Sequence, residues 1–179
     1  MIIIVNDNKK NTELIINHIL SLQNQINEMN KKFDQLNINN NININKQELI
    51  YNEGRYIGQV ANGLPEGKGI IYYNDGDRYE GEWKNGKKEG KGIYFYNKEP
   101  FKGDRYEGDY RNGRGEGKGI YYYHNGDRYE GDFRNELKEG KGIYYYHNGN
   151  RSMGDYYNDN PVGKHVTLTK IGEVKTYNY

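Results

Sequence analysis

A segment at residues 81–87 has the glycine and lysine spacing of a phosphate-binding loop. Its sequence, GEWKNGK, fits the pattern in which backbone N–H groups and a lysine hold phosphate oxygens. Lys88 follows, where a magnesium-binding serine or threonine is required, and no strand-to-helix junction is expected there. The match therefore does not indicate nucleotide binding.

Two histidines at equivalent positions, His124 and His147, could suggest a metal site. Asn74 occupies the same position earlier in the chain, and a third ligand is missing, so a polar turn position explains them better. His18 and His165 have no obvious nucleophile to activate, and the chain contains no cysteine. The recurring acids Glu80, Glu107 and Glu130 fit a solvated strand face rather than an acid and base pair. We therefore predict no enzymatic activity, no cofactor and no metal.

Five lysines recur in E-G-K-G segments or their degenerate equivalent and could attract anionic phospholipid headgroups. They are Lys68, Lys91, Lys118, Lys141 and Lys164. Glutamates two residues earlier in the first four segments cancel much of this field; they are Glu66, Glu89, Glu116 and Glu139. Structural loop charge is the preferred interpretation, and a membrane tether remains an alternative.

The charge and composition limit the remaining classes of function. The 179 residues include 26 basic and 25 acidic side chains, so the formal charge of +1 does not favour nucleic-acid binding. Only 34% of residues are hydrophobic, but 20 are tyrosine. Tyrosine can cover a strand with its ring while its hydroxyl stays in water, which suits a one-layer sheet. The apolar run at residues 1–5 is too short for a signal peptide or a membrane span. We therefore expect a cytoplasmic protein, with the membrane periphery and the cytoskeleton as candidate locations.

A five-residue phrase, Tyr-Glu-Gly-acidic-aromatic, shows how the chain is organised. It opens at Tyr79, Tyr106 and Tyr129, in a weaker copy at Tyr56, and in an eroded copy at Ser152. This spacing predicts five units, near 56–78, 79–105, 106–128, 129–151 and 152–174, within a stacked array over 48–179.

Each unit has the pattern of a β-hairpin. Alternation places Tyr79, Gly81 and Trp83 on one face of the strand, and the return strand adds its own tyrosines to that face. A glycine beneath an aromatic ring lets the ring lie on the backbone; we expect this at Gly81, Gly108, Gly131 and Gly154. The between-unit turns, such as residues 74–77, contain Asp-Gly or Asn-Gly and predict positive φ. The hairpins should therefore join into one antiparallel meander.

These residues carry a family resemblance. Y-x-G-x-W/Y/F, then N-G, then E-G-K-G-I-Y-x-Y and N-G-D resembles the MORN repeat over residues 49–177. The match is strongest in the second to fourth units, and the helix described below lies outside it. The resemblance implies a mainly β, single-layer antiparallel hairpin ribbon, and it includes arrays attached to enzymes and linked to membranes.

A twisted ribbon of this kind forms a groove that can accept a helix or an extended peptide. The candidate partner-binding residues are the return-strand tyrosines Tyr94, Tyr96, Tyr121, Tyr123, Tyr144 and Tyr146. Packing of these rings on each other is the competing explanation, and both can hold. Between the second and third units the turn is longer and exposes Phe101, which is either a neutral insertion or a further partner contact.

The N-terminal part predicts an amphipathic helix over residues 11–36, after a disordered segment at 1–10 and before an Asn-rich linker at 37–47. Its apolar seam has the spacing of a parallel coiled-coil dimer and comprises Ile15, Ile19, Leu22, Ile26, Met29, Phe33 and Leu36. Ile16 and Leu20 widen the stripe, so docking on the chain's own sheet or on a partner helix stays open.

The function that these features favour is a non-catalytic scaffold or adaptor that binds a protein on its aromatic face. The alternatives are a peripheral membrane tether that uses the lysines and a targeting or regulatory subunit of a separate enzyme.

Overall fold

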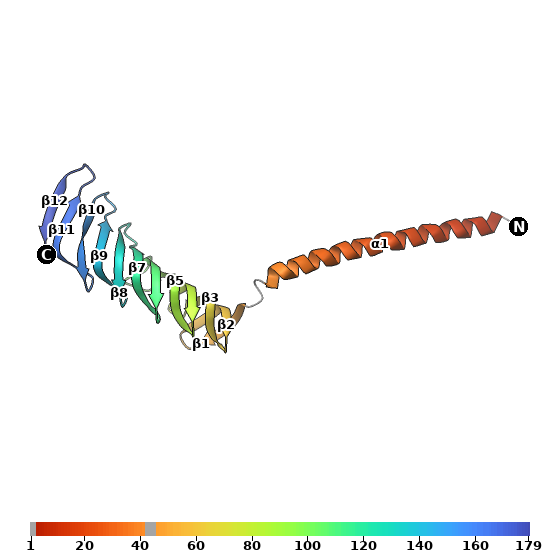
Figure 1. The fold of residues 1–179 in the computed structure, drawn as a ribbon, viewed down its shortest axis with the longest axis horizontal. Coiled ribbons are helices and arrows are strands. Elements are labelled where there is room, and N and C mark those ends of the chain that lie inside the picture. The colour runs from red at the N-terminus through yellow and green to blue at the C-terminus, as the bar shows by residue number, and fades with distance from the viewer. Residues whose placement is uncertain (1–2, 42–45) are drawn as a thin grey trace. The chain divides into compact units, whose positions relative to one another are not determined.

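The computed structural model describes residues 3–41 and 46–179, with side chains described for 12–32 and 46–179. The chain divides into two compact units, Met1–Asn45 and Lys46–Tyr179, which are treated separately below. The first contains one helix and the second one sheet (Figure 1).

Helix α1 runs from Ile3 to Asn41 and is longer than predicted. Residues 3–10, predicted to be disordered, and residues 37–41, predicted to belong to the linker, are helical. Once a helix is nucleated, each added residue gains a backbone hydrogen bond, which extends it beyond its apolar seam. Residues 42–45 of the predicted linker lie outside the described residues, and 46–47 begin the first strand.

No helix in the described part of the chain contains a stretch that is both long and apolar enough to cross a membrane.

The second unit is a single antiparallel sheet whose twelve strands follow the order of the chain. This confirms the predicted hairpin meander, which gains the outer strands β1 and β12 (Figure 1). The strands are β1 Lys46–Tyr51, β2 Gly54–Ala61, β3 Leu64–Tyr73, β4 Arg78–Lys84, β5 Lys87–Phe95, β6 Arg105–Arg111, β7 Arg114–Tyr122, β8 Arg128–Arg134, β9 Leu137–Tyr145, β10 Arg151–Tyr157, β11 Asn160–Leu168 and β12 Val174–Asn178.

The tight turns lie within the units rather than between them. In the first three units an Asn-Gly pair has positive φ at both residues, as Asn85 and Gly86 show at 48° and 76°. Two consecutive left-handed residues match the twist of the flanking strands. In the turns between units, for which we predicted positive φ from Asp-Gly or Asn-Gly, only the glycine adopts it, as at Gly76.

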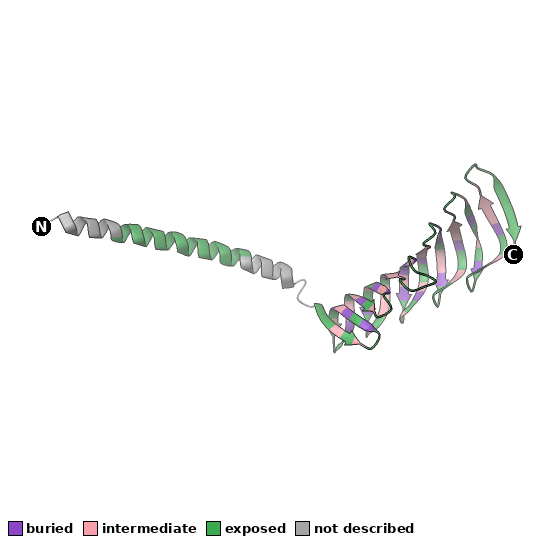
Figure 2. Cartoon of the chain, turned by 180° about the vertical axis from the view of Figure 1, so that it is seen from behind, coloured by how far each residue is buried: buried purple, intermediate pink, exposed green. Residues whose placement is uncertain are grey.

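Buried residues recur along the strands (Figure 2). They lie on one face, called the front face, which carries Tyr79 and its cross-strand neighbours. The ring of Tyr79 lies over the paired glycines Gly81 and Gly92, where any Cβ would overlap it. Its hydroxyl donates a hydrogen bond to the carbonyl oxygen of Glu82 at 3.0 Å. Tyr56, Tyr106 and Tyr129 repeat this arrangement. The prediction that aromatic rings pack on glycine is therefore confirmed for these units. Each ring belongs to the same strand as the glycine two residues after it.

The fifth unit keeps the arrangement with a different ring. Ser152 stands where the tyrosine is expected, and the imidazole of His165, on the neighbouring strand β11, lies over Gly154. Its Nε2–H donates to the carbonyl oxygen of Asp155 at 2.8 Å, as the tyrosine hydroxyls do in the other units. His165 is only 1% exposed, so it is a packing residue of the array.

The opposite face, called the back face, carries a row in which arginine and aromatic side chains alternate from β2 to β10. The row comprises Arg55, Tyr72, Arg78, Phe95, Arg105, Tyr122, Arg128, Tyr145 and Arg151. The guanidinium of Arg128, for example, lies 3.9 Å from the centre of the Tyr145 ring. Stacking of this kind shields the rings from water and is favourable by about 0.5–1 kcal/mol at exposed sites.

Candidate functional site

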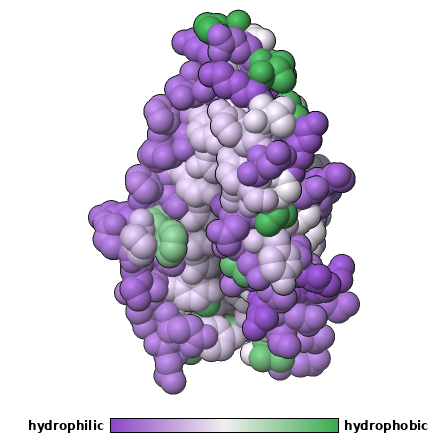
Figure 3. Space-filling model, turned by 90° about the vertical axis from the view of Figure 1, so that its left-hand side faces the viewer, coloured by the Kyte–Doolittle hydropathy of each residue, from purple (hydrophilic) through white to green (hydrophobic). Residues whose placement is uncertain are grey.

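The six predicted groove tyrosines all lie on the front face and form a continuous chain of ring contacts. Consecutive ring centres are 4.7 to 5.9 Å apart, through Tyr73, Tyr94, Tyr96, Tyr121, Tyr123, Tyr144 and Tyr146. Most are half-buried, and Tyr146 is exposed. Packing therefore accounts for part of each ring's burial and leaves the rest of its surface accessible. Figure 3 shows a band of intermediate hydropathy between hydrophilic margins.

Buried aspartates in the between-unit turns orient every second tyrosine of this chain. Asp127 accepts a hydrogen bond from the Tyr144 hydroxyl at 2.9 Å and from the His147 backbone N–H at 2.7 Å. Asp104 does the same with Tyr121 and His124, and Asp77 with Tyr94 and Asn97. Burial acts to raise the pKa of Asp127, but these hydrogen bonds outweigh it and lower the pKa. Each carboxylate thus ties one unit to the next.

This network also explains the two equivalent histidines. The Nδ1 atoms of His124 and His147 lie 2.7 and 2.8 Å from Oδ1 of Asp104 and Asp127. Within residues 12–32 and 46–179, no three acidic, histidine or cysteine side chains gather as a metal site would require. Residues 81–87 lie on β4, a tight turn and β5, so the strand-to-helix junction of a phosphate loop is not formed there.

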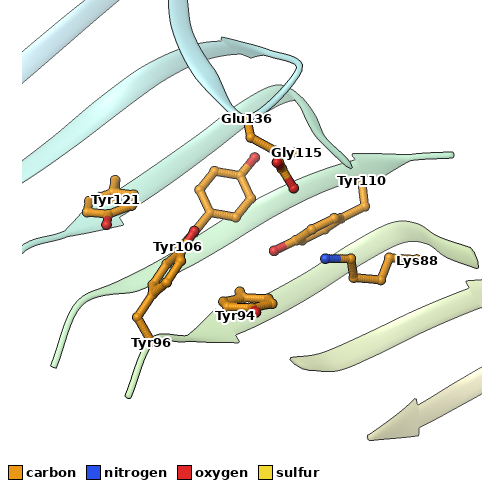
Figure 4. Close-up of a pocket in the computed structure, with 8 residues that line it drawn as sticks. All are labelled: Lys88, Tyr94, Tyr96, Tyr106, Tyr110, Gly115, Tyr121 and Glu136. Atoms are coloured by element: carbon orange, nitrogen blue, oxygen red, sulfur yellow. The ribbon is translucent and has the colours of Figure 1, made fainter. Parts of the chain in front are cut away.

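A pocket of about 170 Å³ opens on the front face between the second and fourth units (Figure 4). Five tyrosine rings line it together with Lys88, Gly115 and Glu136; the tyrosines are Tyr94, Tyr96, Tyr106, Tyr110 and Tyr121. Three of these tyrosines are predicted groove residues, namely Tyr94, Tyr96 and Tyr121, and their rings are in contact in the same row. The pocket therefore lies within the predicted groove.

Lys88 is the cationic group of this pocket. Its Nζ lies 4.8 to 5.5 Å from the ring centres of Tyr79, Tyr94 and Tyr110. Desolvation lowers the pKa of Lys88, and the negative charge of Glu136 acts in the opposite direction. An ammonium held over aromatic faces is stabilised by their quadrupoles and stays available to a carboxylate.

Phe101 lies at the margin of the same region. Its ring centre is 6.0 Å from that of Tyr96, and its side chain is 52% exposed. The longer turn between β5 and β6 thus presents an apolar side chain next to the tyrosine groove. Its use as a partner contact remains a prediction.

The lysines proposed for lipid binding have carboxylates beside them. Lys91 and Lys118 form ion pairs of 2.6 Å with Asp109 and Asp132, and Lys141 lies 3.6 Å from Asp155. These pairs are exposed, so each stabilises the fold by at most about 1 kcal/mol. They nevertheless reduce the positive field that lipid binding would need. Lys68 and Lys164 are exposed as well.

The glutamates of the E-G-K-G segments also have a structural role, which was not predicted. They accept hydrogen bonds from the tight turn of the following unit and keep the negative charge that is expected to cancel much of the field of the lysines. Glu66, Glu89, Glu116 and Glu139 accept from the backbone N–H groups of Asn85, Asn112, Asn135 and Asn158 at 2.8 to 3.4 Å. The sequence reasoning assigned these glutamates from their nearest neighbours along the chain, whereas their partners lie 19 to 23 residues away.

Sequence reasoning did not identify Lys88, Tyr110, Gly115 or Glu136 as site residues. A signal was present, because Gly115 stands where the neighbouring units have lysine, and Glu136 stands where the first three units have glycine. These exceptions to the repeat become meaningful only when the register places them side by side.

Comparison with known proteins gives one family match. The model of the MORN repeat matches residues 56–78, 79–98, 106–128 and 129–151. The fifth unit and the N-terminal helix lie outside these matches. No curated protein sequence matches the chain.

Two solved structures are similar to the sheet at low scores. The TCP10 domain of Danio rerio CPAP, in complex with a STIL peptide, is 13% identical with a TM-score of 0.45, covering 74% of this chain and 64% of that one. The Drosophila melanogaster SAS-4 (dCPAP) TCP domain, in complex with a proline-rich motif of Ana2, is 16% identical with a TM-score of 0.37, covering 75% and 90%. This chain thus spans less than two thirds of the first structure. Scores of this size are too low for an inference about function.

Proposed function

From the premise that this chain is a MORN-repeat protein, we propose that it is a non-catalytic scaffold whose front-face tyrosine groove binds a protein partner. The observation that carries the proposal is the continuous row of half-buried tyrosine rings on a face that nothing in residues 46–179 covers. Tyrosine combines a large apolar surface with a polar hydroxyl and is enriched at protein interfaces.

The groove suits an extended segment or a helix with apolar side chains at intervals. Within the described residues, the hydroxyls of Tyr96 and Tyr110 make no hydrogen bond, so both can donate to the backbone of a partner. Buried aspartates hold the neighbouring rings of Tyr94, Tyr121 and Tyr144 in place. A surface whose rings are already fixed loses little conformational entropy on binding.

A displayed library of random peptides, selected against the full chain, tests this function. Peptides that the chain enriches should bind at least tenfold more weakly to the front-face variant with Tyr96→Ser and Tyr123→Ser. The matched control carries Tyr122→Ser and Tyr145→Ser, which remove half-buried tyrosines from the back face at β7 and β9. Equal loss in both variants, with both folded by circular dichroism, would contradict binding on the front face.

We further propose that α1 forms a parallel dimer with a second copy of the chain. The described seam residues Ile15, Ile19, Leu22, Ile26 and Met29 are 45% to 68% exposed, so this apolar stripe is accessible to a partner. The side chains of Phe33 and Leu36, which complete the predicted seam, lie outside those described. Alternating intervals of four and three residues are those of a two-stranded coiled coil.

Sedimentation equilibrium of the full chain should give the mass of a dimer. Ile19→Asp with Ile26→Asp should shift it to a monomer, whereas Asn17→Asp with Asn24→Asp, on the opposite side of the helix, should not. A monomeric wild-type chain at tens of micromolar would show that the seam does not mediate self-association.

A further inference from the structure

The repeats contain a diagonal contact whose two partners change from unit to unit. In each of the first four units, one front-face residue near the start of the return strand accepts a backbone hydrogen bond from the second turn residue of the next unit. The four pairs are Pro65 with Gly86, Lys88 with Gly113, Gly115 with Glu136, and Lys138 with Asp159. The register places the first member of every pair at the same position of its hairpin.

In the last of these pairs, Lys138 with Asp159, both residues carry a charged side chain. Nζ of Lys138 lies 4.0 Å from Oδ1 of Asp159 and donates a hydrogen bond to the Tyr123 hydroxyl at 2.8 Å. The Lys138 side chain is 16% exposed. Lys138 therefore covers this part of the front face, and Asp159 neutralises its charge, so no binding site is left at this position.

The two middle pairs each contain only one of the charges. Lys88 meets Gly113 and Glu136 meets Gly115, so neither residue has the opposite charge at its own diagonal contact. The negative charge of Glu136 instead acts on Lys88 from another part of the pocket lining, without an ion pair between them in the described residues. Within the described residues, neither charged group forms a hydrogen bond or an ion pair through its side chain. The missing lysine side chain at Gly115 leaves the tyrosine-lined pocket, which Lys88 and Glu136 flank from different strands and turns (Figure 4).

Glu136 also has a backbone that is unfavourable for its side chain. Its φ is 71°, in the left-handed region where the first three units have glycine. A non-glycine residue there costs on the order of 1 kcal/mol. Asp159 of the next unit has the same conformation, with a φ of 68°, but it meets Lys138, whereas the side chain of Glu136 lines the pocket. A strained residue that lines a pocket is a reason to expect a function for its side chain.

A third departure from the repeat lies next to this pocket. The enlarged turn that carries Phe101 packs against Tyr96, which lines the pocket. The glycine in place of lysine and the glutamate in place of glycine thus line one cavity, and the inserted aromatic lies next to a residue of its lining.

We infer that the pocket over Gly115 is the specificity site of the groove and binds a partner segment in which an apolar side chain lies between an acidic and a basic residue. The apolar side chain enters the tyrosine-lined cavity, whose volume is that of a single side chain. The acidic residue pairs with Lys88 and the basic residue with Glu136, so the segment supplies the two charges that the repeat lacks. This inference rests on the proposed function and adds the chemistry of the partner.

The test uses the full chain and a displayed library of capped peptides. Each peptide has one central Leu, Phe, Pro or Tyr between four random positions on either side. The wild-type chain should enrich peptides with an acidic residue on one side and a basic residue on the other. Lys88→Glu with Glu136→Lys should enrich the opposite order of charges, because the reversed site selects a reversed segment. Unchanged charge preferences in this double variant would overturn the inference.

A second variant closes the pocket without disturbing the rest of the groove. Gly115→Lys restores the diagonal ion pair seen at Lys138 and Asp159, and a Cβ at Gly115 meets its nearest atom, on the Tyr106 ring, at 3.2 Å. Fluorescence anisotropy should show that it binds the enriched peptide at least tenfold more weakly than wild type. Equal affinity would overturn the inference.

Glu136→Gly separates a binding role from a structural one. Because it removes the left-handed glutamate, its melting temperature should rise by about 2–4 °C, while the preference for a basic residue disappears. A lower melting temperature with the preference intact would assign Glu136 to the fold instead.

The outcomes also distinguish this site from the proposed function. Suppose that the enriched peptides no longer bind the Tyr96→Ser and Tyr123→Ser variant but still bind the Gly115→Lys variant. This result would support the scaffold function and would overturn the specificity site over Gly115. If the wild-type chain enriches no peptide at all, both proposals fail.

Discussion

The two faces of the sheet use their aromatic rings differently. On the front face, rings such as Tyr79 lie flat on glycine and bond to the backbone of their own strand, so they are buried although no second layer covers them. On the back face, rings such as Tyr145 stand in a row with arginine and stay partly exposed. The comparison teaches that a one-layer sheet can make its core on one side by bringing rings down onto the backbone.

The comparison is sharpest for two tyrosines of the same hairpin. Tyr129→Ala removes a fully buried ring and should lower the free energy of unfolding by about 3–5 kcal/mol, since a cavity over two glycines cannot collapse. Tyr145→Ala on the back face should cost about 1 kcal/mol. Urea unfolding followed by circular dichroism measures both, and equal losses would remove the distinction between the faces.

The glycines beneath the front-face rings should be nearly as sensitive. A Cβ at Gly131 would lie against the Tyr129 hydroxyl and 2.6 Å from the backbone oxygen of Lys141. Gly131→Ala should therefore lower the free energy of unfolding by about 1–3 kcal/mol. Gly115→Ala, on the same face but with its nearest contact at 3.2 Å, serves as the control and should be neutral or slightly stabilising. The reverse order of stability would contradict the close packing of ring on backbone.

The buried Asp127 on the front face should make stability depend on pH. Because the pKa of Asp127 is lowered in the folded state, its contribution is present above the unfolded value of about 3.9 and is lost as the pH falls through the lower folded value. Asp127→Asn should cost about 1–3 kcal/mol at neutral pH. Chemical unfolding between pH 2 and 7 should show a smaller acid-dependent loss in this variant than in wild type. Identical pH profiles would mean that Asp127 is not a link between units.

The smallest effect is expected for the arginine row of the back face. Arg128→Ala exposes the Tyr145 ring and should lower the free energy of unfolding by about 0.5–1 kcal/mol. Arg128→Lys should recover only part of this, since an ammonium does not stack as a planar guanidinium does. A loss above about 2 kcal/mol, larger than the range of exposed cation–π contacts, would place part of the core on the back face.

Much of the fold could be predicted because its determinants are local. The alternation of tyrosine and glycine along each strand, and the Asn-Gly turns, indicate hairpins of fixed length, and the period of the units indicates their order. The helix was predicted with the correct type and incorrect ends, because its extension depends on cooperative hydrogen bonding rather than on side-chain periodicity.

The site could be predicted only in part. The six tyrosines of the groove follow from strand alternation, and all six lie on the expected face. The role of His165 could not be inferred, since it takes over from Ser152 across a strand pair. The aspartates that pair with Lys91 and Lys118 were not predicted for the same reason: neighbours along the sequence are not neighbours across the sheet.

The sequence by itself determined the repeating hairpin, the face to which each side chain points and the tyrosine surface. These depend on a period of two along a strand and on turns of two residues. Only the tertiary structure decided which charges are paired and which remain open. Cross-unit partners are 19 to 23 residues apart, and their meeting depends on register. Within the described residues, Lys88 and Glu136 form no ion pair at the pocket that they line, because the residues diagonally opposite them are glycines.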